Sequence, residues 1–354
     1  MNTQVLPVNE ESIALAAKLL QQGELVALPT ETVYGIAADA RNGEAVKKIF
    51  EAKGRPQDNP LIVHICGMEM LHGIVSEVPE RAKKLAAAFW PGPLTMVMPR
   101  GPEVSEVTCA GLDTVGVRMP SHPVVQAVIK ASGVAFAAPS ANLSGKPSPT
   151  NAQDTFVDMD GRLPLILDGG ESAVGVESTV LDVTSGAPCI LRPGGITKDM
   201  LESVLGHVDV AGSVLRPLQK GEKALSPGMR YKHYSPDGQV TLVEGAEADV
   251  VAAMAKLAAH ADAQGHRACV MCFTEHMDAL KNFHPHDIGS RDNASEVAHR
   301  LFDTLRRLDE EHMDVIFSEV VPPEGVGLAV MNRLGRAAAF HTIQARDVLK
   351  DEEA

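Results

Sequence analysis

The sequence predicts an α/β protein with two domains, and three observations lead to this class. Short apolar runs that fit buried strands alternate with segments whose apolar residues share one face of a helix. The chain has 354 residues, and at about 100–200 residues per domain this length favours two domains. From residue 239 onwards strands and helices alternate regularly, which indicates a doubly wound sheet.

The first domain is expected to be a mixed α/β sheet whose strands end in polar, Gly/Pro-rich loops. Its apolar runs predict strands at residues 24–29, 61–65, 94–98, 114–119, 134–138, 164–168, 178–183 and 189–192. Helical spacing predicts helices at residues 43–53, 80–89, 122–131 and 197–205. Period two in the strand at 61–65 places Ile62 and His64 on one face, and Lys53 falls near the C-terminal end of the first helix.

The second domain is expected to be smaller and Rossmann-like. Its strands are predicted from the runs VTLVEG, RACVMCF and DVIFSEV, and its helices at residues 247–260, 293–308 and about 328–339. We therefore divide the chain into a first domain at 1–207, a basic linker or lid at 208–238 and a C-terminal α/β domain at 239–354.

Composition excludes several classes of protein. The chain is 45% hydrophobic and 22% charged, which is ordinary for a soluble globular protein. No apolar run approaches the roughly 18–20 residues that a membrane span requires, and the N-terminus lacks the basic and apolar regions of a signal peptide. Five scattered cysteines fit a reducing compartment. We expect a cytoplasmic protein with no membrane association.

The charge balance argues against a protein whose main task is to bind nucleic acid. Net charge is −14, whereas such proteins are usually basic because phosphate contacts dominate their affinity. Residues 211–236 are an exception, with five basic residues against the single acidic Glu222: Arg216, Lys220, Lys223, Arg230 and Lys232. This basic connector is either a lid over an anionic ligand or a solvated linker.

Several common site motifs are absent from the sequence. It contains no G-x-x-x-x-G-K-[ST] phosphate loop and no G-x-G-x-x-G after a strand. Cys269 and Cys272 form a C-x-x-C within a predicted strand, where an offset of three puts them on opposite faces, so we expect no metal there. The run from His284 to His286 is interpreted as a polar surface turn.

Polar residues instead gather at the strand ends of the first domain, where α/β proteins tend to place ligands. Thr30 and Thr32 leave one buried strand, and Lys53 and Arg55 follow a helix as two cations that can clamp phosphates. The other candidates at strand ends are Asn59, His64, Arg118, Ser140, Asn142, Ser178, Thr179 and Arg192. Each has a structural alternative, such as a turn, a helix cap, a solvated charge or a histidine satisfied within a sheet. Together they favour an anionic ligand.

At this point the sequence resembles the YrdC-like threonylcarbamoyl-AMP synthases. The motifs that carry the resemblance occur in order over most of residues 10–207: PTETVYG, KGRPQDNPL, WPGPLT, VGVRMP, PSANLSG, GVESTV and LRPGG. The run SPGMRYKHY at 226–234 is similar to the linker of the long, two-domain form of the family. The resemblance implies a twisted α/β sheet domain with a concave cavity, joined to a second α/β domain.

The resemblance also implies an activity, that of a nucleotidyltransferase. Threonine, bicarbonate and ATP would give threonylcarbamoyl-AMP and pyrophosphate, with Mg²⁺ carried by ATP and no metal ligand from the protein. The product would pass to a transferase that makes threonylcarbamoyladenosine on tRNA. We expect direct tRNA binding to be weak or absent.

The resemblance further assigns residues to roles. It makes Lys53 and Arg55 catalytic. It assigns the nucleotide to Lys53, Arg55, Asn59, Ser140, Asn142, Arg192 and Tyr231, and threonine to Thr30, Thr32, His64, Arg118, Ser178 and Thr179. Two alternatives stay open, an RNA-binding module of the same fold and a carbamoyl transferase that acts on another amine.

Overall fold

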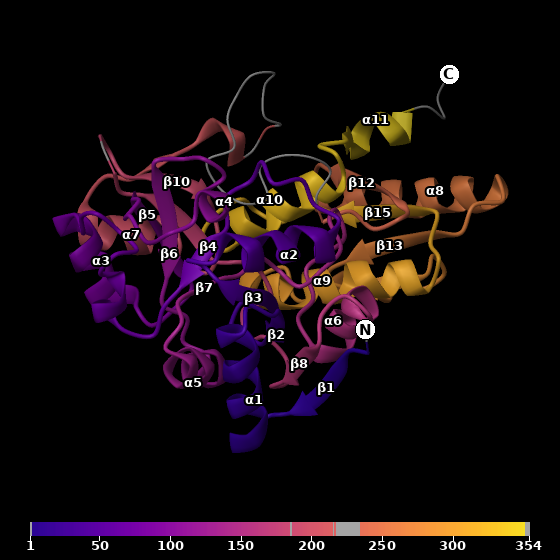
Figure 1. The fold of residues 1–354 in the computed structure, drawn as a ribbon. Coiled ribbons are helices and arrows are strands. Elements are labelled where there is room, and N and C mark those ends of the chain that lie inside the picture. Colours follow the sequence, from indigo (N-terminus) through magenta and orange to yellow (C-terminus); the bar gives the residue numbers. More distant parts are fainter. Residues whose placement is uncertain (1, 185, 215, 217–233, 351–354) are drawn as a thin grey trace. The chain divides into compact units, whose positions relative to one another are not determined.

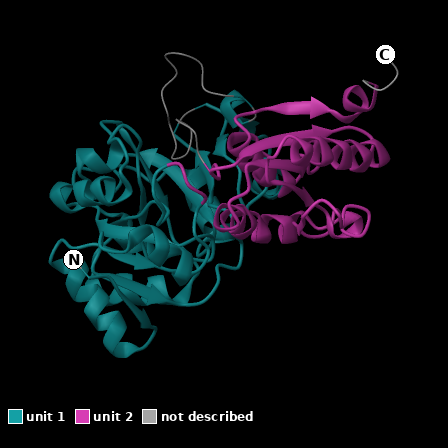
Figure 2. Cartoon of the chain, turned by 90° about the vertical axis from the view of Figure 1, so that its right-hand side faces the viewer, with its two compact units in different colours: residues 1–144, 148–231 teal, residues 145–147, 232–354 magenta. Residues whose placement is uncertain are grey.

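The computed structural model describes residues 2–184, 186–214, 216 and 234–350. It divides the chain into two compact units, shown in Figure 2: the first holds residues 1–144 and 148–231, the second residues 145–147 and 232–354. Each unit contains its own sheet (Figure 1). The predicted α/β class with two sheets is confirmed.

The first unit is built on an 11-stranded mixed sheet with the order β1-β8-β2-β3-β7-β4-β6-β5-β9-β10-β11. The strands are β1 (Gln4–Pro7), β2 (Val26–Leu28), β3 (Gly35–Asp39), β4 (Ile62–His64), β5 (Leu94–Pro99), β6 (Thr114–Arg118), β7 (Phe136–Ala137), β8 (Leu165–Asp168), β9 (Thr179–Asp182), β10 (Cys189–Arg192) and β11 (Asp209–Val210). All eight predicted strands are present. β11 pairs with β10, so two residues that we placed in the linker extend the first sheet.

Seven α-helices accompany this sheet among the described residues: α1 (Glu10–Gln21), α2 (Gly43–Lys53), α3 (Glu80–Phe89), α4 (Glu106–Cys109), α5 (Pro123–Ser132), α6 (Ala152–Met159) and α7 (Lys198–Leu205), together with short 3₁₀ turns at Met68–Leu71 and Gly212–Val214. The four predicted helices are confirmed within one residue at each end. Helix α2 begins at the cap Asn42, whose side chain accepts from two backbone amides, and ends at Gly54 with φ 60°.

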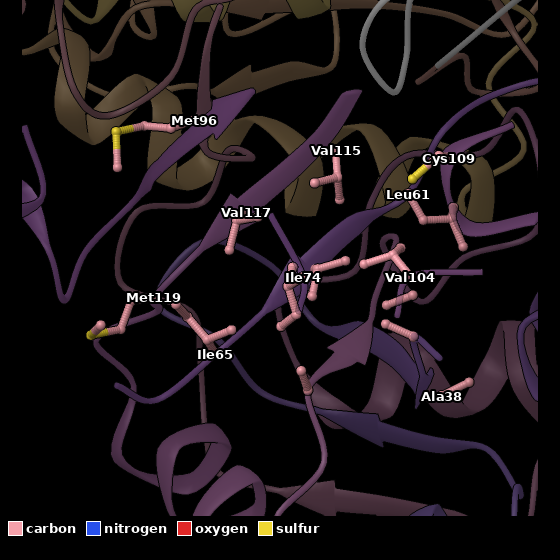
Figure 3. Close-up of a cluster of buried hydrophobic side chains, with 14 of the residues drawn as sticks. Ala38, Leu61, Ile65, Ile74, Met96, Val104, Cys109, Val115, Val117 and Met119 are labelled. Atoms are coloured by element: carbon pink, nitrogen blue, oxygen red, sulfur yellow. The ribbon is translucent and has the colours of Figure 1, made fainter. Parts of the chain in front are cut away.

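The middle strands have one apolar face, which forms the main core. In β6, for example, Val115 and Val117 point into the cluster drawn in Figure 3, together with Leu61 and Ile65, which flank β4. Alternation along a strand then turns His64 of β4 and Arg118 of β6 to the opposite face. This second face is buried as well and carries apolar residues such as Ile62 and Phe136, so His64 and Arg118 are enclosed there.

The second unit has a five-stranded parallel sheet with the order β14-β13-β15-β12-β16. Its elements are β12 (Gln239–Glu244), α8 (Glu247–Ala263), β13 (Ala268–Cys272), a 3₁₀ turn (Thr274–His276), β14 (Pro285–Asp287), α9 (Ala294–Glu310), β15 (Val315–Glu319), α10 (Gly327–Ala337), β16 (Thr342–Gln344) and α11 (Ala345–Lys350). Parallel strands joined by helices form the predicted doubly wound arrangement.

One prediction for this unit was wrong. The run from His284 to His286 is not a surface turn: Pro285–Asp287 is the edge strand β14, and His286 is buried. The run is polar because an edge strand needs fewer apolar side chains than a central one. Cys269 and Cys272 are both buried in β13 as free thiols, and burial raises the pKa of each to about 12.

Within the part of the chain that the structure describes, no helix is both long and apolar enough to cross a membrane.

Candidate functional site

The loop between β2 and β3 presents Thr30 and Thr32 in a fixed arrangement. The Thr30 hydroxyl accepts hydrogen bonds from the amides of Thr32 and Val33 and donates to the Val33 carbonyl at 2.6 Å. It lies 2.9 Å from the hydroxyl of Thr32. The side chain of Thr30 therefore stabilises the turn that follows it, and both threonines are buried.

Arg118, the last residue of β6, reaches this loop. Its Nη1 donates to the Thr32 hydroxyl at 2.9 Å, and its Nη2 lies 2.7 Å from Oε1 of Glu31. Both members of the ion pair are nearly inaccessible, with side chains 4% and 10% exposed. Burial acts to raise the pKa of the Glu31 carboxyl, but the charge and hydrogen bonding of Arg118, together with hydrogen bonds from the backbone amides of Glu31 and Ser121, outweigh burial, so the pKa is lowered.

Glu31 was not assigned a role from the sequence, although it stands inside PTETVYG. Its carboxylate is buried against Arg118, and hydrogen bonds from the backbone amides of Glu31 itself and of Ser121 help to lower its pKa. The loop therefore places an anion, the cation of Arg118 and two hydroxyls together.

His64 lies beside Arg118 because β4 and β6 pair in parallel with these two residues in register. The ring stacks on Phe136 with centroids 5.9 Å apart, and Nδ1 lies 3.1 Å from the Ile62 carbonyl oxygen. Complete burial, together with the charge of Arg118, lowers the His64 pKa to about 3. At neutral pH this imidazole is uncharged, so it can exchange hydrogen bonds with a ligand but adds no positive charge.

Ser178, just before β9, belongs to a second buried network. Its hydroxyl lies 2.8 Å from that of Thr95 on β5 and accepts from Nη2 of Arg192 at 3.1 Å. Nε of Arg192 donates to the Ser178 carbonyl, also at 3.1 Å. Thr95 pairs in register with Arg118 across β5 and β6, so this network adjoins the first. Thr95 stands inside the motif WPGPLT, but we assigned it no role from the sequence.

The neighbouring Thr179 is used differently. Its hydroxyl donates to the Ile196 carbonyl at 2.6 Å and accepts from the Ile196 amide. Both of these bonds tie β9 to the segment after β10. In the structure, the Thr179 hydroxyl therefore makes two hydrogen bonds to Ile196 that stabilise the fold. Its role at a threonine site stays a prediction.

Lys53 is buried at the C-terminal end of α2. Its Nζ donates to the carbonyl oxygens of Ser140 and Asn142, the latter at 2.6 Å. The loop that contains these residues also meets the Thr30–Thr32 loop, because the Ala141 amide donates to the Tyr34 carbonyl at 2.8 Å. Lys53 therefore carries its charge into the loop that follows β7, beside the loop that holds Thr30 and Thr32.

The remaining predicted residues differ in what the structure shows of them. The guanidinium of Arg55 lies over the ring of Phe50, 5.9 Å from its centroid. Asn59 is 1% exposed, and its Oδ1 has no hydrogen-bond partner within the described ranges. Tyr231 and most of the predicted lid at 211–236 lie outside the described residues. Among those described, no cluster of His, Cys, Asp and Glu could hold a metal ion.

Comparison with known proteins gives a consistent result along the chain. Residues 18–194 match the family model described as "Telomere recombination", and residues 196–339 match the one described as "Threonylcarbamoyl-AMP synthase, C-terminal domain". The chain is 46% identical over 345 residues to a threonylcarbamoyl-AMP synthase of Bacillus subtilis, which covers 97% of each chain. It is 44% identical to that of Pyrococcus abyssi, over 95% of this chain and 97% of the other.

A solved structure extends this likeness to three dimensions. The crystal structure of P. abyssi Sua5 complexed with L-threonine superposes with a TM-score of 0.91 at 43% identity, covering 97% of this chain and 99% of that one. The likeness spans both units, including their sheets.

Proposed function

This chain belongs to the threonylcarbamoyl-AMP synthase family, and from that premise we propose that it makes threonylcarbamoyl-AMP from L-threonine, bicarbonate and ATP. The observation that carries the proposal is the buried Arg118, held between the Thr32 hydroxyl and the Glu31 carboxylate. A free amino acid carries both charges, and Arg118 offers the cationic fork that its carboxylate requires. The likeness to a structure that contains L-threonine supports the same substrate.

The reaction needs no nucleophile from the protein. The amine of threonine captures bicarbonate as a carbamate, with loss of water. A carbamate oxygen then attacks the α-phosphorus of ATP, and the bond to the β-phosphate oxygen breaks to release pyrophosphate. The protein contributes position and charge, as is usual for transfer at phosphorus.

We assign threonine to the Arg118 side of the site. Arg118 would hold its carboxylate, and the hydroxyls of Thr30, Thr32 and Ser178 would surround its amine and side chain. Thr179 keeps its place in this predicted set, although its hydroxyl bonds to Ile196. His64 would take part as a neutral hydrogen-bonding ring, because an imidazole with a pKa of about 3 is not protonated at neutral pH.

We assign the nucleotide to the Lys53 side. Ser140 and Asn142 lie within reach of the Lys53 ammonium, which already contacts their carbonyl oxygens. Arg55, Asn59, Arg192 and Tyr231 complete the proposed set. The cations would neutralise phosphate charge as it moves towards pyrophosphate. Mg²⁺ would arrive with ATP and shield the remaining charge of the triphosphate.

Cellular context follows from the chemistry of the product. A mixed carboxylic–phosphoric anhydride is short-lived in water, so a transferase that modifies tRNA has to take it up soon after release. We propose a cytoplasmic protein, because all five of its cysteines are free thiols. We propose no direct role for RNA in the synthase reaction.

Pyrophosphate release tests the proposal. Purified chain with threonine, bicarbonate and Mg-ATP should release pyrophosphate without any RNA, and omission of threonine or bicarbonate should abolish the release. Serine should work less well, since one methyl contact is worth about 1–3 kcal/mol. Equal release without threonine would indicate a carbamoyl transferase for another amine and would contradict the proposal.

A further inference from the structure

The segment that leads into β5 contacts both neighbouring strands of the first sheet. The Gly92 carbonyl accepts from Nε of Arg118 in β6 at 3.3 Å, and the Pro93 carbonyl accepts from the amide of Thr179 in β9 at 3.0 Å. Strand pairing then continues on both sides, and it sets Thr95 in register with Arg118. The backbone of Thr95 is therefore fixed from two sides, all within the first unit.

The two branches of the Thr95 side chain point to different neighbours. Its methyl lies over Gly116 of β6, where an added Cβ would come within 3.2 Å of it. Its hydroxyl lies 2.8 Å from that of Ser178, just before β9. A β-branched side chain has few χ1 rotamers. Because the methyl fills the space beside Gly116, the hydroxyl is directed at Ser178.

Burial bears on which of the two hydroxyls donates. Thr95 is 0% exposed, and among the described residues its hydroxyl has no hydrogen-bond partner other than Ser178. If Ser178 donated, the proton of Thr95 would be buried without an acceptor, which is costly. If Thr95 donates, the proton left over belongs to Ser178. A ligand bound at Ser178 can accept that proton, so in the complex this second arrangement satisfies both hydroxyls.

Arg192 uses the remaining acceptor capacity of Ser178. Its Nη2 donates to the Ser178 hydroxyl at 3.1 Å, and a guanidinium can only donate. With Thr95 as the second donor, both lone pairs of the Ser178 oxygen are occupied, and the hydroxyl can offer a ligand only its proton. Ser178 therefore suits an oxygen of the substrate, such as that of a carbamate formed on the threonine amine. It does not suit an ammonium group, which requires an acceptor.

We infer that Thr95 is a positioning residue for threonine binding, which presents Ser178 to the substrate as a hydrogen-bond donor. The inference rests on the proposed assignment of Ser178 to threonine. Arg192 alone does not have this effect, because a hydroxyl with one donor can still turn its proton about the Cβ–Oγ bond. Without the Thr95 hydroxyl, the Ser178 proton faces the substrate for a smaller fraction of the time, and the apparent affinity for threonine falls by that fraction.

The test compares Thr95→Val, which keeps the shape and the methyl but removes the hydroxyl, with Thr95→Ser, which keeps the hydroxyl. Thr95→Val is also combined with Ser178→Ala, which removes the group that Thr95 acts on. Thr108→Val is the matched control, since Thr108 of α4 is equally buried and its hydroxyl donates to the Ala40 carbonyl at 2.9 Å. The KM for threonine and the KM for ATP are measured from pyrophosphate release by the full chain, and the melting temperature on the same preparations.

Thr95→Val should raise the KM for threonine about threefold, as expected for one hydrogen bond between uncharged groups, and should leave the KM for ATP close to wild type. Thr95→Ser should keep the KM for threonine within about twofold of wild type. In the Ser178→Ala background Thr95→Val should have no further effect on this KM, because the two hydroxyls act as one unit. Thr108→Val should lower the melting temperature as Thr95→Val does but leave both KM values unchanged.

An unchanged KM for threonine in Thr95→Val would overturn the inference while leaving the proposed function in place. So would a rise in both KM values, or an effect that persists in full in the Ser178→Ala background, since either would indicate a general loss of structure. A wild-type chain whose pyrophosphate release does not depend on threonine would overturn the proposed function as well.

Discussion

Arg118 and Glu31 form an ion pair of 2.7 Å in which both side chains are almost completely buried. Two buried charges of this kind stabilise the fold only while they are paired with each other, because water cannot hydrate either one. Their pairing brings the end of β6 to the loop after β2, 87 residues earlier in the chain.

Glu31→Gln should therefore destabilise the protein by about 3 kcal/mol, the usual cost of leaving one buried charge unpaired. The pH dependence has a definite sign. The pKa of Glu31 is lowered in the folded chain, so its contribution is present above the unfolded pKa of about 4.3 and is lost as pH falls through the folded value. Denaturant unfolding of both proteins between pH 7 and pH 3 should show the difference shrinking in acid. The exposed Glu80→Gln, which loses a surface pair with Lys83, should unfold like wild type at every pH.

His64 gives a second pH-dependent prediction. Its pKa of about 3 in the folded chain lies far below the unfolded value near 6.5. The stability linked to the neutral ring is therefore present above about pH 6.5 and is lost as pH falls towards 3. Between pH 7 and pH 5 the wild type should lose about 2 kcal/mol relative to His64→Gln. Parallel unfolding curves for the two proteins over this range would contradict the assignment of a neutral, buried ring.

Substitutions of Lys53 and Arg55 should both lower turnover but should differ in their effect on the melting temperature. Both are assigned to the triphosphate, so the loss of either should cut turnover by orders of magnitude. Lys53 is also buried, and its loss removes the hydrogen bonds that it donates to the Ser140 and Asn142 carbonyls. Lys53→Met should lower turnover at least about a hundredfold and lower the melting temperature by several degrees.

Arg55→Ala is the companion variant. It should lower turnover by a similar factor, while the melting temperature moves by no more than about one degree, because its ring contact with Phe50 is partly exposed. Steady-state pyrophosphate release and thermal unfolding, measured on the same preparations, distinguish the two. Full activity in both variants would place the phosphate-binding cations elsewhere.

Ser178 and Thr179 are adjacent but should behave as opposites. Ser178→Ala removes the hydroxyl that accepts from Arg192 and that we assign to threonine, so the KM for threonine should rise about fivefold, as expected for one lost hydrogen bond of about 1 kcal/mol. Thr179→Val keeps the shape but removes both bonds to Ile196. It should lower the free energy of unfolding by about 1–2 kcal/mol and leave KM values near wild type. A larger effect of Thr179→Val on KM for threonine than on stability would support its predicted place at that substrate.

Local pattern was sufficient to predict much of the fold. The sequence placed α3 and β10 at their observed ends, because each is a single apolar period bounded by Pro, Gly or a change of period. Helix α1 was missed although its pattern was readable: Asn9 caps it, and Ala16, Ala17 and Leu20 share its buried face. β11 and β14, with two and three residues, are too short and too polar for periodicity to reveal.

The site was predictable as a set of strand ends but not as a network. Thr95 has no polar neighbour in the sequence, and only the pairing of β5 with β9 and β6 brings it to Ser178 and Arg118. Glu31 lies within the motif PTETVYG, but its pairing with Arg118 depends on the order of strands in the sheet. Contacts of this kind follow from topology, which the spacing of apolar residues does not encode.

The passage of Gly145–Pro147 through the second unit has an evolutionary consequence. A domain that joins its neighbour by one connection can be gained, lost or exchanged by a single recombination event at that point. Here the chain passes between the two units at three points, after residues 144, 147 and 231. Removal of residues 232–354 alone would leave Gly145–Pro147, a part of the second unit, behind in the first. The two parts of this gene are therefore expected to have been inherited together.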